Sequence, residues 1–283
     1  MTVRKGVSAV TPADNNYLKI GKPKSIAAGI PAATSSMLHG IKKMGAIRTV
    51  KTLTTVNQPE GFDCPGCAWP DPKHATAFEF CENGAKAVAD EAMKGGVNPN
   101  FFSKYTVQEL SQKSDYWLNN QGRITEPMVL NKGSNKYETI SWKDAIELVS
   151  NTIKDSNNPD RSVFYTSGRT SNEAAFLYQL FARTLGTNNM PDCSNMCHES
   201  SGRGLGESIG IGKGTVTLED FNYANVILVI GQNPGTNHPR MLTALRDAKR
   251  KGAKIVHVNP LPETGLVRFK HPQDYMKLSF GSE

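Results

Sequence analysis

Apolar positions recur with a helical period in the stretch that begins at Ser141. They lie three to four residues apart and share one face of a helix: Ala145, Ile146, Val149 and Ile153. Ser141 precedes them as an N-cap residue, and Asp144 three positions later gives a pattern close to a capping box. The stretch 141–156 therefore predicts an amphipathic helix with a defined start.

A strand–turn–helix unit is predicted after this helix. Short apolar and β-branched runs indicate a strand over Ser162–Thr166, and a turn at residues 167–169 leads to a helix over Asn172–Leu185. Gly186 suits the position after that helix, where a left-handed backbone is common.

A second unit of the same kind is predicted between residues 225 and 258. It consists of strand Asn225–Ile230, loop Gly231–Asn237, a helix from near Pro239, and strand Lys254–Val258. The strand text VILVI is apolar at every position, which predicts that both faces are covered, as in a parallel sheet flanked by helices. The expected fold class is therefore α/β, with a domain over residues 141–272 built on a parallel sheet flanked by helices.

The beginning of the chain has no such period. Prolines interrupt residues 1–58, so an extended arm is expected there. The formal net charge of the 283-residue chain is +7, and basic residues crowd the first 51 positions with Asp14 as the only acid. This predicts a solvated basic arm, because no nucleic-acid-binding motif accompanies the charge. Residues 59–140 form a cysteine-bearing region and connecting segment, and residues 273–283 a separate tail.

The sequence contains no run of about 20 apolar residues of the kind that spans a membrane. The stretch from Met1 to Ala46 does not have the pattern of an export signal. We therefore expect a cytoplasmic protein without a membrane partner. The cysteines are odd in number, which favours metal ligation or catalysis over a disulfide framework: Cys64, Cys67, Cys81, Cys193 and Cys197.

Three of these cysteines surround a proline-rich loop in the text GFDCPGCAWPDPKHATAFEFCENG. The pair Cys64 and Cys67 can present two thiolates to one metal, and soft thiolate suits zinc or an iron–sulfur cluster. With Cys81 as the third ligand, His74 would complete a zinc site of the Cys3His kind. The residues leave three alternatives open: a zinc site, a [4Fe–4S] cluster, or cysteines without a metal.

Cys197 directly precedes His198 and a run rich in glycine, residues 202–214. Glycine lets a backbone approach a bulky ligand closely, and amides in such a loop can bind phosphate oxygens. Arg203 and His198 give Cys197 an electropositive neighbourhood that favours thiolate. Adjacent side chains do not face one another, so Cys197 and His198 are not by themselves a nucleophile–base pair. A small buried cysteine in an ordinary loop is the alternative.

The loop GQNPGTNHP, residues 231–239, connects the carboxyl end of a predicted strand to a helix. Ligands bind at that end of open α/β sheets, and a helix N-terminus favours anions. The loop has no G-x-G-x-x-G pattern, so the ordinary dinucleotide fingerprint is absent. A plain connecting loop is the alternative.

Taken in order, these three pieces resemble the bis-molybdopterin guanine dinucleotide oxidoreductases, of which formate dehydrogenase is the familiar member. The likeness is greatest to the YdeP-like branch of formate-dehydrogenase-like proteins and extends from about Gly61 to Phe269. It implies molybdenum bis(molybdopterin guanine dinucleotide) and a [4Fe–4S] cluster as cofactors. It also implies a small-molecule substrate such as formate and an electron acceptor that the resemblance does not identify.

The resemblance also assigns roles to individual residues. Cys197 would bind molybdenum, and His198 would accept or donate a proton beside it. Residues at two strand ends would shape the pterin nucleotide site: Gly231, Asn233, Pro234, His238, Asn259 and Pro260. Cys64, Cys67 and Cys81 would hold the cluster that relays electrons from two-electron chemistry at molybdenum.

The chain departs from the family pattern at the cluster. Relatives carry a cysteine four residues after Cys67, where this chain has Asp71, a weaker ligand toward a soft cluster. We expect Asp71 to complete the metal-ligand set. Formate dehydrogenases have a lysine at the position of Asn83, and Lys86, one helical turn further on, is expected to replace it.

The chain is also much shorter than family members, and its text no longer clearly resembles them after about Pro272. We hypothesise a truncated or frameshifted gene product with an exposed sheet edge. Two other functions stay open. One is a non-catalytic zinc-binding protein that uses the three cysteines and His74, and the other is an inactive truncated relative.

Overall fold

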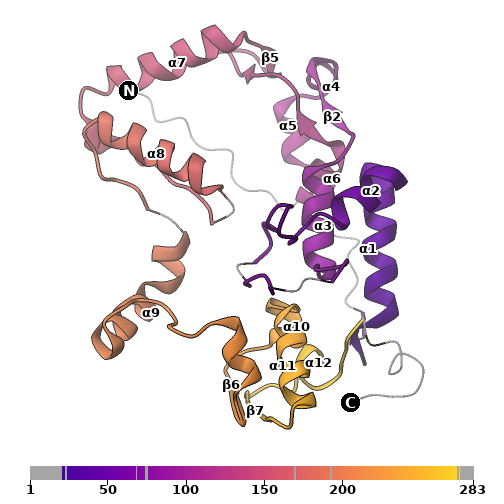
Figure 1. Ribbon diagram of the computed structural model, residues 1–283. Coiled ribbons are helices and arrows are strands. Elements are labelled where there is room, and N and C mark those ends of the chain that lie inside the picture. The colour runs from indigo at the N-terminus through magenta and orange to yellow at the C-terminus, as the bar shows by residue number, and fades with distance from the viewer. Residues whose placement is uncertain are drawn as a thin grey trace. The chain divides into compact units, whose positions relative to one another are not determined.

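The computed structural model describes residues 21–22, 24–67, 69–73, 76–168, 170–191, 193–272 and 274. The chain divides into two units, each described below by itself. Unit 1 comprises Met1–Glu126, Leu130–Glu138 and Thr217–Glu283, and unit 2 comprises Pro127–Val129 and Thr139–Val216. Figure 1 labels the helices and strands in chain order.

Unit 1 begins with a helical part and ends with an α/β part. The first part contains β1 (Ala27–Ala28), α1 (Gly29–Met44), α2 (Ala46–Leu53), α3 (Glu82–Glu91), β2 (Gly96–Val97), α4 (Pro99–Lys104), α5 (Val107–Ser111), α6 (Asp115–Gln121) and β3 (Arg123–Ile124). The second part contains the 3-10 helix Leu218–Asn222, β6 (Val226–Ile230), α10 (Pro234–Asn237), α11 (Met241–Arg250), β7 (Lys254–Val258), α12 (Thr264–Val267) and β8 (Phe269–Lys270).

Unit 2 is mainly helical. Its elements are α7 (Trp142–Asp155), the 3-10 helix Pro159–Arg161, α8 (Asn172–Thr184) and α9 (Cys193–Ile209). The short strands β4 (Met128–Val129) and β5 (Glu138–Thr139) lie where the chain passes between the units.

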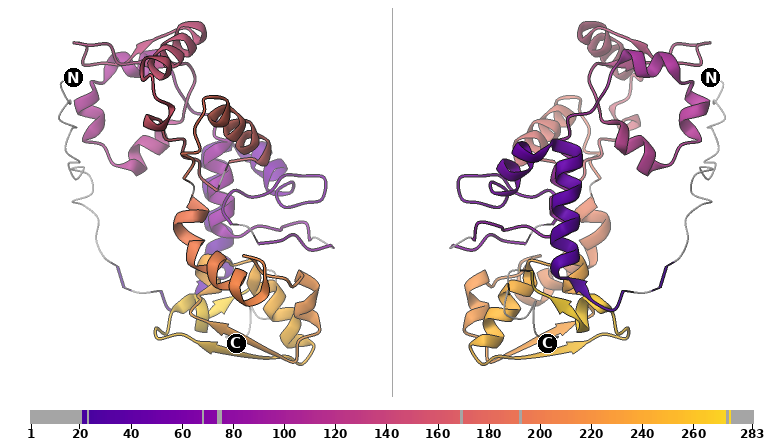
Figure 2. Two further views of the ribbon diagram at one scale, coloured as in Figure 1. Left: turned by 90° about the vertical axis from the view of Figure 1, so that its left-hand side faces the viewer. Right: turned by 90° about the vertical axis from the view of Figure 1, so that its right-hand side faces the viewer.

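The expectation of an extended arm over residues 1–58 is wrong for the part that the structure describes. Residues 29–53 form α1 and α2, and the side chains of Met44, Leu53 and Val56 are fully buried. α1 lies beside α3 in both Figure 1 and Figure 2. Proline punctuation suggested an arm, but Pro31 lies in the first turn of α1, where its missing N–H costs nothing.

Polar groups also join α1 to α3. The Asp90 carboxylate of α3 accepts a hydrogen bond from His39 at 2.9 Å and lies 3.3 Å from the ammonium group of Lys43. Burial alone would raise the pKa of Asp90, but the hydrogen bonds from His39 and Lys43 outweigh it and hold the pKa below its ordinary value. The two helices are therefore linked by charge as well as by apolar packing.

The predicted parallel sheet is present only in part. β6 and β7 pair in parallel with Ile230 opposite Val258, close to the predicted strand bounds, and β1–β8 and β2–β3 are two further short parallel pairs. Two expectations are not met. Residues 162–166 form no strand, and one face of β6 is exposed, with Leu228 at 61%. An all-apolar strand is buried on both faces only where helices cover both faces of its sheet. Among the described residues, one face of β6 lacks such a cover.

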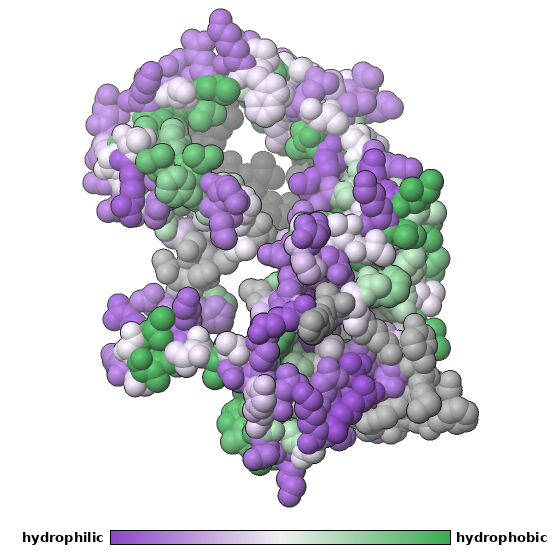
Figure 3. Space-filling view, viewed as in Figure 1, coloured by the Kyte–Doolittle hydropathy of each residue, from purple (hydrophilic) through white to green (hydrophobic). Residues whose placement is uncertain are grey.

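The helices predicted for unit 2 are confirmed. The Ser141 hydroxyl accepts a hydrogen bond from the Asp144 amide at 3.1 Å and caps α7, and Gly186 follows α8 with φ of +89°. Their apolar faces are exposed: none of the residues of α7 is buried, and Figure 3 shows hydrophobic side chains gathered on α8. No helix in the described part of either unit is long and apolar enough to cross a membrane.

Candidate functional site

The loop that carries Cys64 is held by a buried asparagine. Asn57 has a left-handed backbone with φ of 54°, and its side-chain oxygen accepts a hydrogen bond from the Cys64 amide at 2.8 Å. Its side-chain amide donates to the carbonyl of Glu79 at 2.6 Å. Because Asn tolerates the left-handed conformation better than most residues, it can turn the chain here and still fix both flanks of the cysteine region.

Two of the three cysteines meet at the start of α3. The Cys81 sulfur is the N-cap and accepts a hydrogen bond from the Gly84 amide at 3.3 Å. A Cβ at Gly84 would lie 2.9 Å from the Cys64 sulfur and 3.6 Å from the Cys81 sulfur. Only glycine at this position leaves room for both sulfurs, so the segment forms a cradle for thiols.

The three thiols lie close enough to repel one another as thiolates. Burial raises the pKa of Cys64, and the charges of Cys81 and Cys67 add to that effect, while the Gly66 amide and Arg240 oppose it. Burial and Cys67 likewise raise the pKa of Cys81. A bound cation would relieve this repulsion, since metal binding favours the deprotonated thiol.

The geometry within the described residues does not match a single-ion site. Among them, no three His, Cys, Asp or Glu side chains are arranged to hold one metal ion. His74, the expected fourth ligand of zinc, lies outside the described residues.

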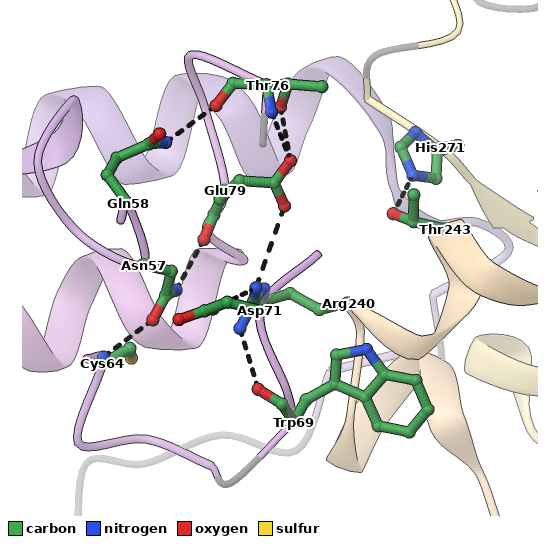
Figure 4. Close-up of polar contacts among 10 residues, drawn as sticks. All are labelled: Asn57, Gln58, Cys64, Trp69, Asp71, Thr76, Glu79, Arg240, Thr243 and His271. Atoms are coloured by element: carbon green, nitrogen blue, oxygen red, sulfur yellow. Dashed lines mark hydrogen bonds and ion pairs between the residues drawn. The ribbon is translucent and has the colours of Figure 1, made fainter. Parts of the chain in front are cut away.

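Arg240 joins the cysteine loop to the α/β part of unit 1. Figure 4 shows its guanidinium between the Trp69 carbonyl, the Asp71 carboxylate and Glu79. The distances are 3.1 Å to the Trp69 oxygen, 2.6 Å to Asp71 Oδ1 and 3.9 Å to Glu79 Oε2. The role of Asp71 as a metal ligand stays a prediction, and in this structure its carboxylate is engaged by Arg240.

Two more contacts tie the same loop to the segment before β6. The rings of Trp69 and Phe221 meet edge to face with centroids 5.8 Å apart, and Lys73 lies 3.2 Å from the Glu219 carboxylate. We call Trp69, Asp71 and Lys73, with their partners Phe221, Arg240 and Glu219, the loop latch. It fixes the chain just after Cys67 onto residues 219–240.

The predicted nucleotide loops lie at one edge of the β6–β7 sheet. Gly231 follows β6 with φ of +67° and donates its amide to the Val258 carbonyl at 2.8 Å, and Asn259 follows β7 directly. Both loops therefore start at the carboxyl ends of parallel strands, where open α/β sheets bind ligands.

Asn233 is the polar residue that packing leaves unsatisfied in this region. Its side-chain oxygen is buried and has no hydrogen-bond partner in the described part of the chain. Next to it, Gly235 and Gly265 bring α10 and α12 into backbone contact, so a Cβ at Gly235 would collide with the Gly265 carbonyl. A buried acceptor without a partner is costly, and a donor from a ligand would satisfy it.

The other predicted residues of these loops take structural positions. Pro234 is buried at the first position of α10, and His238 ends that helix with its amide bonded to the Pro234 carbonyl. Asn259 donates to the Glu263 carboxylate at 3.0 Å and accepts from the Leu261 amide, while Pro260 is exposed. The structure thus brings the six predicted nucleotide-site residues to adjacent loops.

Cys197 and His198 belong to unit 2. The glycine-rich stretch was expected as a loop, but residues 193–209 form α9, with a kink at His198, where φ is −121°. Cys197 is exposed, and Arg203 pairs with Glu199 at 2.8 Å. A Cβ at Gly204 or Gly206 would meet nothing within 4 Å, so packing among the described residues does not require glycine there. Their role toward a ligand stays a prediction.

A cavity of about 540 Å³ lies elsewhere in unit 1, between α11, β7 and β8. Its lining is apolar with several basic side chains, and His271 is part of it. None of the predicted site residues lines this cavity, so it lies apart from the candidate site.

Sequence reasoning missed the residues that hold the site together: Asn57, Glu79 and Arg240. Arg240 directly follows the motif GQNPGTNHP. Its position beside this motif is the sequence feature that could have pointed to a role in the site. Lys86, the expected replacement for the family lysine, is on α3 as predicted but pairs with Glu82 at 2.6 Å. Long-range partners such as these are not visible in a residue pattern.

The family model described as molybdopterin oxidoreductase matches residues 123–282, more than half of the chain. The chain belongs to the molybdopterin oxidoreductase family. The match includes residues 273–282, which we expected to lie outside the resemblance.

Three relatives show how the similarity is distributed. An uncharacterized oxidoreductase of Mycobacterium tuberculosis is 57% identical over 92% of this chain and 34% of its own length. Protein YdeP of Escherichia coli is 51% identical over 91% of this chain and 34% of its own length. The F420-dependent formate dehydrogenase subunit alpha of Methanocaldococcus jannaschii is 32% identical over 62% of this chain and 26% of its own length. The chain spans about a third of the length of the two nearer relatives.

Proposed function

We propose that this chain carries the cysteine centre, the metal-ligating cysteine and part of the pterin nucleotide site of a molybdenum oxidoreductase. The observation that carries the proposal is the strand-end pair of loops at Gly231 and Asn259, with the buried, unpartnered oxygen of Asn233 between α10 and α12. In a family named for molybdopterin, this is the position and the chemistry that a nucleotide with amide or amino donors requires.

Different residues of the chain would bind the metal, transfer the proton and seat the nucleotide. Cys197 would supply a thiolate to molybdenum, and His198 would take or give a proton beside it. Gly231, Asn233, His238 and Asn259 would seat the nucleotide at the sheet edge. The molybdenum–pterin group, when bound, supplies two-electron redox chemistry, and the protein positions the substrate against it.

The cysteine centre would handle electrons one at a time. The sulfurs of Cys64 and Cys81 lie at Gly84, and Cys64, Cys67 and Cys81 would repel one another as thiolates, which favours a bound cation. We propose an iron–sulfur cluster there, because thiolates are its usual ligands.

The substrate and the acceptor belong to the proposal as well. The likeness to a formate dehydrogenase subunit favours a small molecule such as formate, oxidised with release of a proton and two electrons. Fold relatives accept different substrates, so formate is the first compound to test rather than a deduction from the site.

The test is a metal analysis of the anaerobically purified full chain, with a visible spectrum. We expect molybdenum together with about four iron atoms per chain and the broad absorption of a cluster. Zinc without molybdenum would favour the zinc-binding alternative. No metal at all would favour an inactive relative and reject the proposal.

A further inference from the structure

We propose that Asp71 is the counter-ion of Arg240 rather than a metal ligand, so that the chain supplies three thiolates and leaves one iron of the cluster without a protein ligand. The inference rests on the proposed function, because it concerns the same cysteine centre. It departs from the expectation that Asp71 completes the ligand set.

The Asp71 carboxylate is already paired with Arg240. Asp71 Oδ1 lies 2.6 Å from the guanidinium of Arg240, whose side chain is 9% exposed. Arginine keeps its charge at every accessible pH, and a buried charge that loses its partner is strongly destabilising. If Asp71 moved to iron, the nearest carboxylate of the structure's described residues would be Glu79 at 3.9 Å.

Glu79 is a poor substitute for Asp71. Its Oε1 already accepts hydrogen bonds from the amide and the hydroxyl of Thr76, at 2.8 Å and 2.7 Å. The Nε of Arg240 is buried and has no hydrogen-bond partner among the described residues. Apart from Asp71, the guanidinium donates to the Trp69 carbonyl at 3.1 Å, and a neutral carbonyl does not replace the charge of the lost carboxylate.

The loop latch holds the chain on both sides of Asp71. Trp69 and Lys73 hold the loop on both sides of Asp71, against Phe221 and Glu219. These contacts hold the loop at residue 71 toward the segment 219–240, where the Asp71 carboxylate pairs with Arg240.

A carboxylate is also better suited to pair with a guanidinium than to bind iron in a sulfide cluster. A carboxylate is a hard donor and competes poorly for iron bound to sulfide, while an aspartate–guanidinium pair is among the strongest ion pairs available. A cluster held by Cys64, Cys67 and Cys81 alone would have one iron without a protein ligand, and an exchangeable ligand such as water would complete it. That iron should leave the cluster more readily than the other three.

The experiment compares iron in the full chain after anaerobic reconstitution with ferrous iron and sulfide. We expect wild type and Asp71→Asn to bind the same amount of iron, and an iron chelator to remove about one of four atoms quickly from both. Asp71→Cys supplies a fourth thiolate and should abolish this fast loss. Asp247→Asn, which breaks an ion pair with Arg246 on α11, is the matched control.

A double-mutant cycle tests the counter-ion role independently of iron. Asp71→Asn and Arg240→Gln should each lower the unfolding midpoint of the metal-free chain, and the double variant should lose less than their sum. Additive losses would overturn the counter-ion assignment.

The remaining outcomes separate this inference from the proposed function. Loss of iron in Asp71→Asn but not in Arg240→Gln would make Asp71 a ligand and overturn the inference. If the wild type and Cys81→Ser both fail to bind iron, the cluster itself is wrong and the three-thiolate claim falls with it, while the cycle would still decide the ion pair.

Discussion

The helices of the two units follow similar rules of sequence but differ in what they bury. α1, α2 and α3 of unit 1 enclose Met44, Leu53, Val56 and Ala89, each with at most 1% of its surface exposed. In unit 2, α7 buries no residue and α8 buries only Ala182 among the residues described. Both sets are amphipathic, so the difference lies in the presence of a complementary surface.

The two units also differ in how firmly they hold their candidate site cysteines. Cys64 and Cys81 lie in unit 1, where Asn57 binds the Cys64 amide and Cys81 caps α3, and their sulfurs share the cradle at Gly84. Cys197 lies in unit 2 on an exposed, kinked helix. The apolar side chains of α7 and α8 in the same unit are largely exposed.

The largest stability effect is expected in the core of unit 1. Met44→Ala should lower the free energy of unfolding by about 2 to 5 kcal/mol, because it removes buried methylenes and leaves a cavity. Chemical denaturation followed by circular dichroism measures the loss. Ile47→Ala, at a side chain 89% exposed, is the control and should change little. Equal losses in both variants would show that α1 and α2 do not pack as described.

A pH-dependent loss is expected from His271. Burial, with a smaller contribution from Arg246, lowers its pKa to about 4. The unfolded chain binds this proton near pH 6.5 and the folded chain only near pH 4, so its contribution is complete above pH 6.5 and is lost as the pH falls from 6.5 to 4. The loss should be on the order of 3 kcal/mol, since one pKa unit corresponds to about 1.4 kcal/mol.

The measurement is denaturation at several pH values, compared with His271→Gln. The variant should have a flatter profile between pH 6.5 and 4, because its side chain does not titrate. The same slope in both proteins would mean that His271 is already exposed to solvent in the folded chain.

A smaller, local effect is expected in unit 2. Ser141→Ala removes the cap of α7 and should cost about 1 kcal/mol of helix stability, seen as faster amide exchange over residues 142–146. Ser150→Ala lies in the interior of the same helix and should leave exchange unchanged or slower, since alanine favours helix. Faster exchange in both would indicate that the serine hydroxyl at 141 is not the cap.

The smallest effect is expected on the exposed face of α7. Val149 is 58% exposed, so Val149→Ser should change the unfolding free energy of this chain by less than about 0.5 kcal/mol. A loss comparable to that of Met44→Ala would mean that the face is buried in solution and would remove the contrast between the two units.

The sequence predicted local structure well and long-range structure poorly. Ser141 as a cap, Gly186 after α8 and the bounds of β7 all depend on neighbours within a few residues. The strand predicted over residues 162–166 did not form. A strand needs a neighbouring strand to pair with, and the sequence of one segment does not specify that neighbour. Residues 1–58 were expected to be an arm, yet α1 and α2 within this range pack against α3, a contact between segments far apart in the sequence.

The candidate site shows the same division. Loop positions after β6 and β7 followed from strand ends and parallel pairing, and the cysteines from their spacing. Arg240 was missed, since its partners Trp69 and Asp71 lie 171 and 169 residues away in sequence. Asn233 carried a predicted role, but only the structure shows that its side-chain oxygen is buried without a partner.

The measurement that tests the central claim most directly is the metal content of Cys197→Ser and Cys81→Ser, each purified anaerobically beside the wild-type chain. We expect that Cys197→Ser loses molybdenum and keeps iron, while Cys81→Ser loses iron and keeps molybdenum. A wild type that held zinc alone, with Cys81→Ser losing that zinc and Cys197→Ser keeping it, would contradict the proposed molybdenum and cluster sites.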